Sequence, residues 1–143
     1  MLRKRGFTLI ELIIVIAVIS ILIGIALPRF RGMQEAGYVA QAKGELRTLQ
    51  TAVESYYIHN SETLPAALTD LTSDTPNVIG SALPTDPFKS GSNYVYSPAT
   101  DYYVIYSVGP GGTGSASVTG AGVASDTGNA IYVTNGSPAD TAP

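Results

Sequence analysis

One uninterrupted apolar run near the start of the chain constrains its fold more than any other feature. The run extends from Phe7 to Leu27, twenty-one residues with a single charge at Glu11. As a helix rising about 1.5 Å per residue, it spans roughly 30 Å, about the thickness of a bilayer core. The segment Arg3–Arg5 before it is entirely basic. Basic residues favour the cytoplasmic side, so we expect a single-pass protein with a cytoplasmic N-terminus and the rest of the chain outside.

Glu11 needs an explanation in such a helix. A carboxylate in an apolar span costs on the order of 3 kcal/mol, and a residue this costly usually has a partner. A cleaved secretory signal fits poorly, because the apolar run is long and no small-x-small cleavage site follows it. An uncleaved signal-anchor helix is the alternative, and it leaves Glu11 unexplained.

The segment Arg3–Leu12, RKRGFTLIEL, resembles the N-terminus of type IV pilin-like proteins, with their class III prepilin signal peptide. The resemblance implies cleavage between Gly6 and Phe7 by a prepilin peptidase, followed by methylation of the new amino group of Phe7. It also implies a partner for Glu11, namely the ammonium group of Phe7 on a neighbouring subunit in the filament. A buried pair of this kind is plausible for fixing the register between subunits.

The same resemblance implies three parts: a leader peptide at 1–6, a transmembrane or filament-core helix at 7–28 and a globular pilin-like domain at 29–143. It places the subunit in the bacterial inner membrane before assembly and in a periplasmic or extracellular filament afterwards. Its implied partners are copies of itself, minor pilins or pseudopilins, the prepilin peptidase, the inner-membrane assembly platform and a cytoplasmic ATPase.

The helix is expected to change character after the apolar run. Gly24 and Pro28 flank the end of the run, and proline removes a backbone donor, so we expect a kink or a loosened turn there. Further on, apolar residues recur at steps of three and four, which is the spacing of one helix face: Val39, Ala42, Leu46, Leu49, Val53 and Tyr56. We therefore predict one helix continuing to about His59. The chain that follows, or a coiled-coil partner, would cover this stripe.

The second half of the chain predicts a small sheet. Asn60–Leu83 is expected to be a connecting loop, with a helical turn or two at Ala66–Leu71. Three segments rich in β-branched and aromatic residues predict strands, at Asn93–Ser97, Tyr102–Val108 and Ala130–Thr134. This order of elements predicts an α+β roll, in which an antiparallel sheet of about three strands packs on the helix stripe. The tail Asn135–Pro143 is expected to be frayed.

Within the family, three features most resemble the major pseudopilins of type II secretion. They are Asp86-Pro87-Phe88, the tyrosine-rich hairpin, and the run Ser107–Gly112. In those proteins the loop between the later strands commonly binds calcium through aspartate side chains and backbone carbonyls. The corresponding segment, Gly109–Asn129, is rich in Gly, Ser, Thr and Ala and is expected to form a long loop.

The candidate calcium ligands in that loop are few. Asp126 is its only acidic residue, with Ser125 and Asn129 near it. Calcium prefers about six to eight oxygens, often from several carboxylates. Two interpretations are therefore left open, a calcium site and a mobile, uncharged surface loop.

Composition narrows the classes of function. The formal charge is −3; without the three basic residues of Arg3–Arg5, five basic and eleven acidic residues give −6. Nucleic-acid binding needs basic patches, so it is not expected. With no cysteine, one histidine and no carboxylate pair of recognisable spacing, an anchored enzyme has little support. The main hypothesis is a filament subunit, either a secretion pseudopilin or a type IV pilus pilin for adhesion, motility or DNA uptake. A membrane-anchored binding module is the further alternative.

Overall fold

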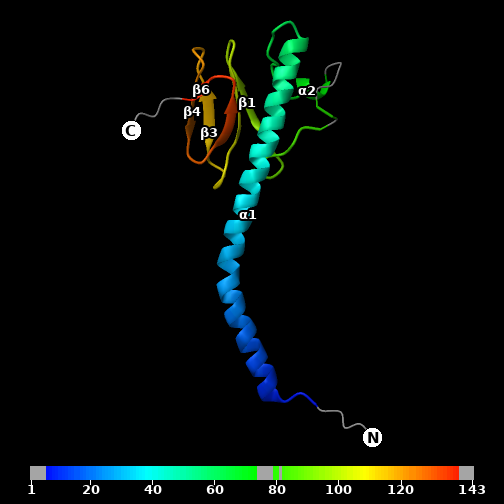
Figure 1. Cartoon of the computed structure of the whole chain (residues 1–143), viewed down its shortest axis with the longest axis vertical. Coiled ribbons are helices and arrows are strands. Elements are labelled where there is room, and N and C mark those ends of the chain that lie inside the picture. The colour runs from blue at the N-terminus through cyan, green and yellow to red at the C-terminus, as the bar shows by residue number, and fades with distance from the viewer. Residues whose placement is uncertain (1–5, 74–78, 81, 139–143) are drawn as a thin grey trace. The chain divides into compact units, whose positions relative to one another are not determined.

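The computed structural model describes residues 6–73, 79–80 and 82–138. Backbone contacts divide the chain into two compact units, Met1–Ala36 and Gly37–Pro143. The described residues form two helices and six strands, in this chain order (Figure 1): α1 (Leu9–His59), α2 (Asp70–Ser73), β1 (Val95–Pro98), β2 (Tyr103–Ser107), β3 (Ser115–Val118), β4 (Val123–Thr127), β5 (Ile131–Thr134) and β6 (Ser137–Pro138).

The first unit holds the apolar part of α1. This helix is long and apolar enough to cross a membrane, and its most apolar window of 18 residues has a mean hydropathy of 3.0. Helical backbone continues from Leu9 through Gly24 and residue 28 to His59, which confirms the predicted continuous helix. The kink expected at Gly24 and Pro28 stays a prediction.

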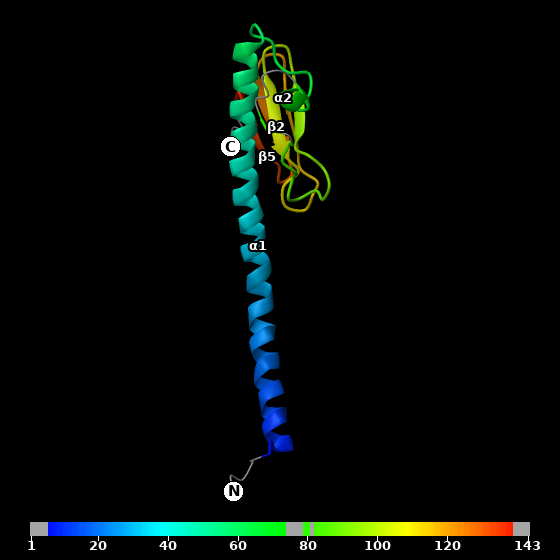
Figure 2. The ribbon, with the colours of Figure 1, turned by 90° about the vertical axis from the view of Figure 1, so that its right-hand side faces the viewer.

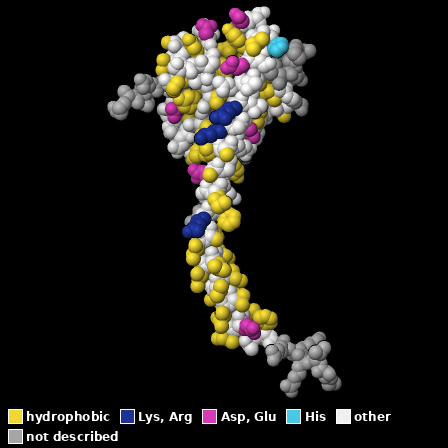
Figure 3. Space-filling model, viewed as in Figure 1, with side chains coloured by type: hydrophobic (Ala, Val, Ile, Leu, Met, Phe, Trp, Pro, Cys, Tyr) yellow, Lys and Arg dark blue, Asp and Glu magenta, His cyan; other side chains and the backbone are white. Residues whose placement is uncertain are grey.

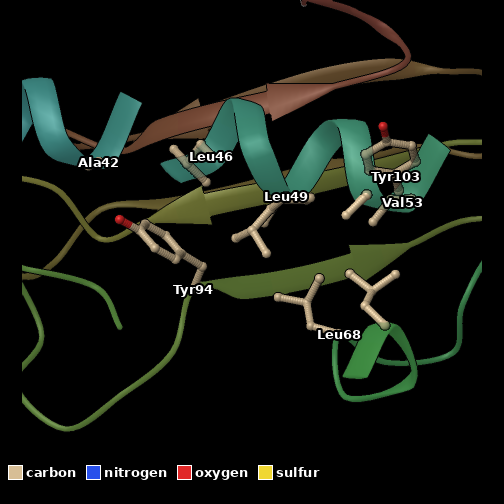
Figure 4. Close-up of a cluster of buried hydrophobic side chains, with 10 residues drawn as sticks. Ala42, Leu46, Leu49, Val53, Leu68, Tyr94 and Tyr103 are labelled. Atoms are coloured by element: carbon tan, nitrogen blue, oxygen red, sulfur yellow. The ribbon is translucent and has the colours of Figure 1, made fainter. Parts of the chain in front are cut away.

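The second unit is built around the predicted stripe of α1. Ala42, Leu46, Leu49 and Val53 are completely buried. In the ribbon, the sheet lies beside this part of α1 (Figure 2). The four residues pack against aromatic and aliphatic side chains from other parts of the unit (Figure 4), chiefly Leu68, Leu71, Tyr94, Tyr103 and Ile105. The stripe is therefore covered by the chain's own sheet, as the α+β prediction requires, and not by a coiled-coil partner.

The sheet that covers the stripe has the strand order β1-β2-β5, with both pairings antiparallel. Its strands fall within one or two residues of the three predicted segments. Strand residues alternate between the two faces, so Tyr103 and Ile105 of β2 point toward α1 while Val104 points away. Val104 is nevertheless fully buried. Something must therefore cover the far face of this sheet.

A second sheet, β3-β4-β6, provides that cover. Strand β3 lies against β2, and the buried residues of the hairpin are the small Ala116 and Ala124. The prediction of a long loop at Gly109–Asn129 is thus wrong, because that segment contains the β3–β4 hairpin. The hairpin was missed because its inward residues are alanines, which give only a weak alternating hydrophobic signal.

The structure also differs from two other predictions, in the bounds of the short helix and of the frayed tail. The predicted helical turns at Ala66–Leu71 lie slightly later, as α2. The tail is ordered to residue 138: β6 pairs in parallel with β4, and the Asn135 side chain accepts a hydrogen bond of 2.8 Å from the amide of Tyr103. The remainder of the predicted frayed tail, 139–143, lies outside the described residues.

A buried carboxylate joins the segment before β1 to the end of β2. Asp86 is only 3% exposed. It accepts hydrogen bonds from the Ser107 hydroxyl (2.8 Å), the Val108 amide (2.9 Å) and the Phe88 amide (2.9 Å). Three donors around one carboxylate compensate for its removal from water. The Asp86 side chain therefore holds the segment before β1 against the end of β2 inside the second unit.

We predict that Leu49→Ala costs roughly 2–5 kcal/mol in the free energy of unfolding, because it leaves a cavity between α1 and the first sheet. Urea unfolding of a fragment comprising residues 29–143 measures this. Ile58→Ala is the matched control, since Ile58 lies on the same helix and is 74% exposed. Equal stability of the two variants would mean that the stripe does not form the core.

We also predict that Asp86→Ala lowers the unfolding free energy by roughly 2–5 kcal/mol, since each buried donor left without an acceptor costs about 1–3 kcal/mol. Asp86→Asn keeps an acceptor oxygen and should lose less. Asp126→Ala, at an exposed position of β4, should change little. If Asp86→Ala lost no more unfolding free energy than Asp126→Ala, the hydrogen bonds of Asp86 would not stabilise the fold.

Candidate functional site

The predicted processing residues lie together just before α1. Gly6, Phe7 and Thr8 precede the first helical residue and have no regular secondary structure. Phe7 is 80% exposed, and nothing lies within 4 Å of where a side chain on Gly6 would begin. The peptide bond between Gly6 and Phe7 is therefore accessible within the described part of the chain.

Glu11 has a local partner that the sequence analysis did not identify. The Thr8 hydroxyl oxygen accepts a hydrogen bond from the Glu11 amide (3.3 Å), and the hydroxyl donates to the Glu11 carboxylate (3.4 Å). Threonine at the helix cap with glutamate three residues later is the pattern of a capping box. The sequence signal was present as Thr8-Leu9-Ile10-Glu11. Thr8 therefore caps the start of the helix, and the Glu11 carboxylate accepts a hydrogen bond from the capping hydroxyl in the single subunit.

The helix surface around Glu11 is apolar on every side. Its large hydrophobic side chains between Phe7 and Leu27 are all exposed, by 45–80%. Such an area is far larger than the apolar patches that monomeric soluble proteins usually expose. Its surroundings must be lipid or other apolar helices. The geometry is suited to membrane insertion and helix bundling, with Glu11 as the one carboxylate inside that surface.

Two glutamates of α1 bind tyrosines of the sheet. The Tyr94 hydroxyl donates to Glu45 (2.7 Å), and the Tyr103 hydroxyl donates to Glu54 (3.0 Å). Burial, followed by the hydrogen bond to its glutamate, raises the pKa of each tyrosine above its usual range. Both phenols therefore stay neutral donors at ordinary pH. These contacts attach the sheet to the helix.

The only histidine of the chain also has a structural role. His59 is the last residue of α1, and its Nδ1 lies 2.7 Å from the carbonyl oxygen of Ser55. A carbonyl oxygen can only accept, so Nδ1 carries the proton in this contact. The ring thus caps the end of the helix.

The three candidate calcium ligands do not converge. Ser125 and Asp126 are successive residues of β4, so their side chains point to opposite faces of the second sheet. The Ser125 hydroxyl lies 3.4 Å from that of Ser117, and the Asn129 amide donates to the Pro110 carbonyl (3.3 Å). Within the described residues, no three His, Cys, Asp or Glu side chains form a cluster that could hold a metal ion. This geometry does not fit a calcium site made from these three side chains.

Comparison with known proteins gives a consistent result at the N-terminus. Residues 1–27 match the prokaryotic N-terminal methylation motif. The type IV major pilin protein PilA of Myxococcus xanthus is 49% identical over 55 residues, which is 38% of this chain and 25% of that protein. A fimbrial protein of Pseudomonas aeruginosa is 40% identical over 67 residues, 47% of this chain and 44% of that protein.

Another relative matches over much more of the chain. The type II secretion system core protein G of Klebsiella pneumoniae is 32% identical over 126 residues, covering 78% of this chain and 89% of that protein. The matches to the pilins and fimbrial proteins, in contrast, span between 25% and 64% of their length. No solved structure matches the chain.

The methylation motif, the exposed apolar helix and the α+β unit agree with these relatives. Because the match to core protein G extends over most of both chains, the chain belongs to the type IV pilin-like family, which includes type IV pilins and the major pseudopilins of type II secretion.

Proposed function

We propose that this chain is the structural subunit of a helical pseudopilus that drives protein export in type II secretion. The observation that carries the proposal is the extent of the similarity to core protein G, which continues from the N-terminal helix into the globular unit. A structural role is supported by Glu45, Glu54, Asp86 and His59, which are all engaged in contacts that hold the fold together.

A type IV pilus subunit is the second candidate. It is supported by a higher identity to a pilin, 49% over 55 residues for PilA, against 32% over 126 residues for core protein G. The methylation motif at residues 1–27 is compatible with assembly in either system. The match to core protein G covers 78% of this chain, against 38% for PilA, and this longer match supports secretion as the first candidate.

The order of the chain's parts indicates the steps by which the subunit would be inserted, processed and assembled. Arg3–Arg5 would keep the N-terminus cytoplasmic while the apolar helix spans the inner membrane. A prepilin peptidase would then cut between Gly6 and Phe7, and the new amino group would be methylated. Assembly would proceed on the inner-membrane platform with minor pseudopilins and would be powered by a cytoplasmic ATPase. The finished filament would lie in the periplasm.

Deleting the gene and scoring two phenotypes separates the candidates. Loss of secreted proteins with unchanged surface fibres supports the pseudopilus, whereas loss of surface fibres with normal secretion supports the pilus. In parallel, the intact mass of the mature subunit should correspond to a chain that starts at Phe7 with one added methyl group. A mature chain that keeps Met1, or one cut near Leu27, would refute assembly by this route.

We predict that Glu11→Ala reaches the membrane at normal or higher levels but assembles poorly, because it removes the only carboxylate in the apolar surface. Filament yield and membrane content are measured separately. Two matched variants separate the charge from the capping box. Glu11→Gln removes the charge while keeping a capping partner, so it should also assemble poorly. Thr8→Ala removes the cap while keeping the charge, so it should assemble much better. Normal assembly of Glu11→Gln would show that the charge is not needed.

Calcium binding can be tested directly on the globular unit, although the geometry does not favour the three predicted ligands. A bound ion would raise the melting temperature of the 29–143 fragment by mass action. We expect equal melting temperatures with calcium and with excess chelator, in both the unaltered fragment and Asp126→Ala. A calcium-dependent rise that disappears in Asp126→Ala would establish a site at Asp126 after all.

A further inference from the structure

A charged stripe runs along α1 beside the buried one. Its members recur at steps of four and three residues, so they share one helix face: Lys43, Arg47, Gln50, Glu54 and Tyr57. The charge is divided along this stripe. Both basic residues lie in its N-terminal half and the acidic residue lies in its C-terminal half.

The basic half has no partner in the subunit. The side chains of Lys43 and Arg47 are exposed, and neither side chain forms a hydrogen bond or ion pair with any residue that the structure describes. The space-filling view shows basic side chains gathered over α1 on the visible face of the second unit (Figure 3). Two cations one helical turn apart therefore face outward from the same surface.

The acidic half borders a cavity. Its volume is about 150 Å³, and its lining includes the two carboxylates of Glu54 and Asp101 but no basic side chain. Tyr57, Tyr103 and Asn135 contribute polar groups to the same wall. The cavity adjoins the last turns of α1, where the helix dipole also favours a cation. Glu54 accepts one hydrogen bond, from Tyr103, and the Asp101 side chain has none within the described residues.

We infer that Lys43 and Arg47 of one copy dock against the Glu54–Asp101 cavity of the next copy along the filament. This inference rests on the proposed function, because subunits anchored in one membrane carry their helices parallel. Arg47 and Glu54 are seven residues apart, so a stagger of roughly 10 Å along the helix brings them level in neighbouring copies. Such a contact joins two different surface patches, and its repetition builds an open helical array and not a closed dimer.

Cross-linking tests the contact in the full chain, produced with its assembly machinery. The protein has no cysteine, so introduced thiols react alone. Paired arginine and glutamate side chains hold their backbones further apart than a disulfide allows, so a short bis-maleimide is used. Arg47→Cys combined with Glu54→Cys should give a ladder of multimers. Arg47→Cys with Asp101→Cys, which leaves the Tyr103–Glu54 bond intact, should give the same ladder. Lys89→Cys with Glu54→Cys, from an exposed lysine outside the stripe, should give none.

Charge exchange provides the second measurement. Arg47→Glu alone and Asp101→Arg alone each place like charges together and should lower filament yield by roughly tenfold or more. Combining the two changes should restore most of the yield, whereas Lys89→Glu should leave it unchanged. Filaments that form without any 47–54 or 47–101 ladder, or an exchange that restores nothing, would overturn the inference while leaving the proposed function intact. Failure of the unaltered chain to form filaments would overturn both.

Discussion

Burial of one stripe of α1 under the first sheet is the interaction on which the rest of the structure depends. Leu46, Leu49 and Val53 lose all contact with water there. Each such side chain contributes about 1.5–3 kcal/mol on burial. The hydroxyl groups of Tyr94 and Tyr103 lie at the same boundary, where they donate hydrogen bonds to Glu45 and Glu54. A chain without disulfides thus obtains one core from the helix and the strands, and the second sheet completes it by covering Val104.

The same helix has a second use in its N-terminal part. From Phe7 to Leu27 it buries nothing, and its large apolar side chains stay exposed. Two different patterns in one element explain this division, since the first is apolar all round and the second is apolar along one stripe. The first pattern suits lipid and helix bundling, and the second suits a folded unit. Under the proposed function the subunit needs both, because it would pass from a membrane into a filament.

The sequence predicted the strong patterns and missed the weak ones. The end of α1 at His59 and the three strands of the first sheet followed from helical spacing and from runs of β-branched and aromatic residues. The β3–β4 hairpin did not, since its buried positions are Ala116 and Ala124. Asp86 was recognised as part of a family motif, but two of its three donors lie more than twenty residues away at Ser107 and Val108. The capping of α1 by Thr8 and Glu11 was visible in the sequence, although the cost of a buried charge suggested a partner on another subunit.

Residues from Gly37 onward form a compact unit, and we expect this unit to fold without the apolar segment. Hydrogen exchange of a fragment comprising residues 29–143 tests this most directly. The amides of Leu46, Leu49 and Val53 on α1 should exchange only on global unfolding, with the same free energy of opening as those of Val104 and Ile105 in β2. Much faster exchange in α1 than in β2, or a fragment that does not unfold cooperatively, would contradict it.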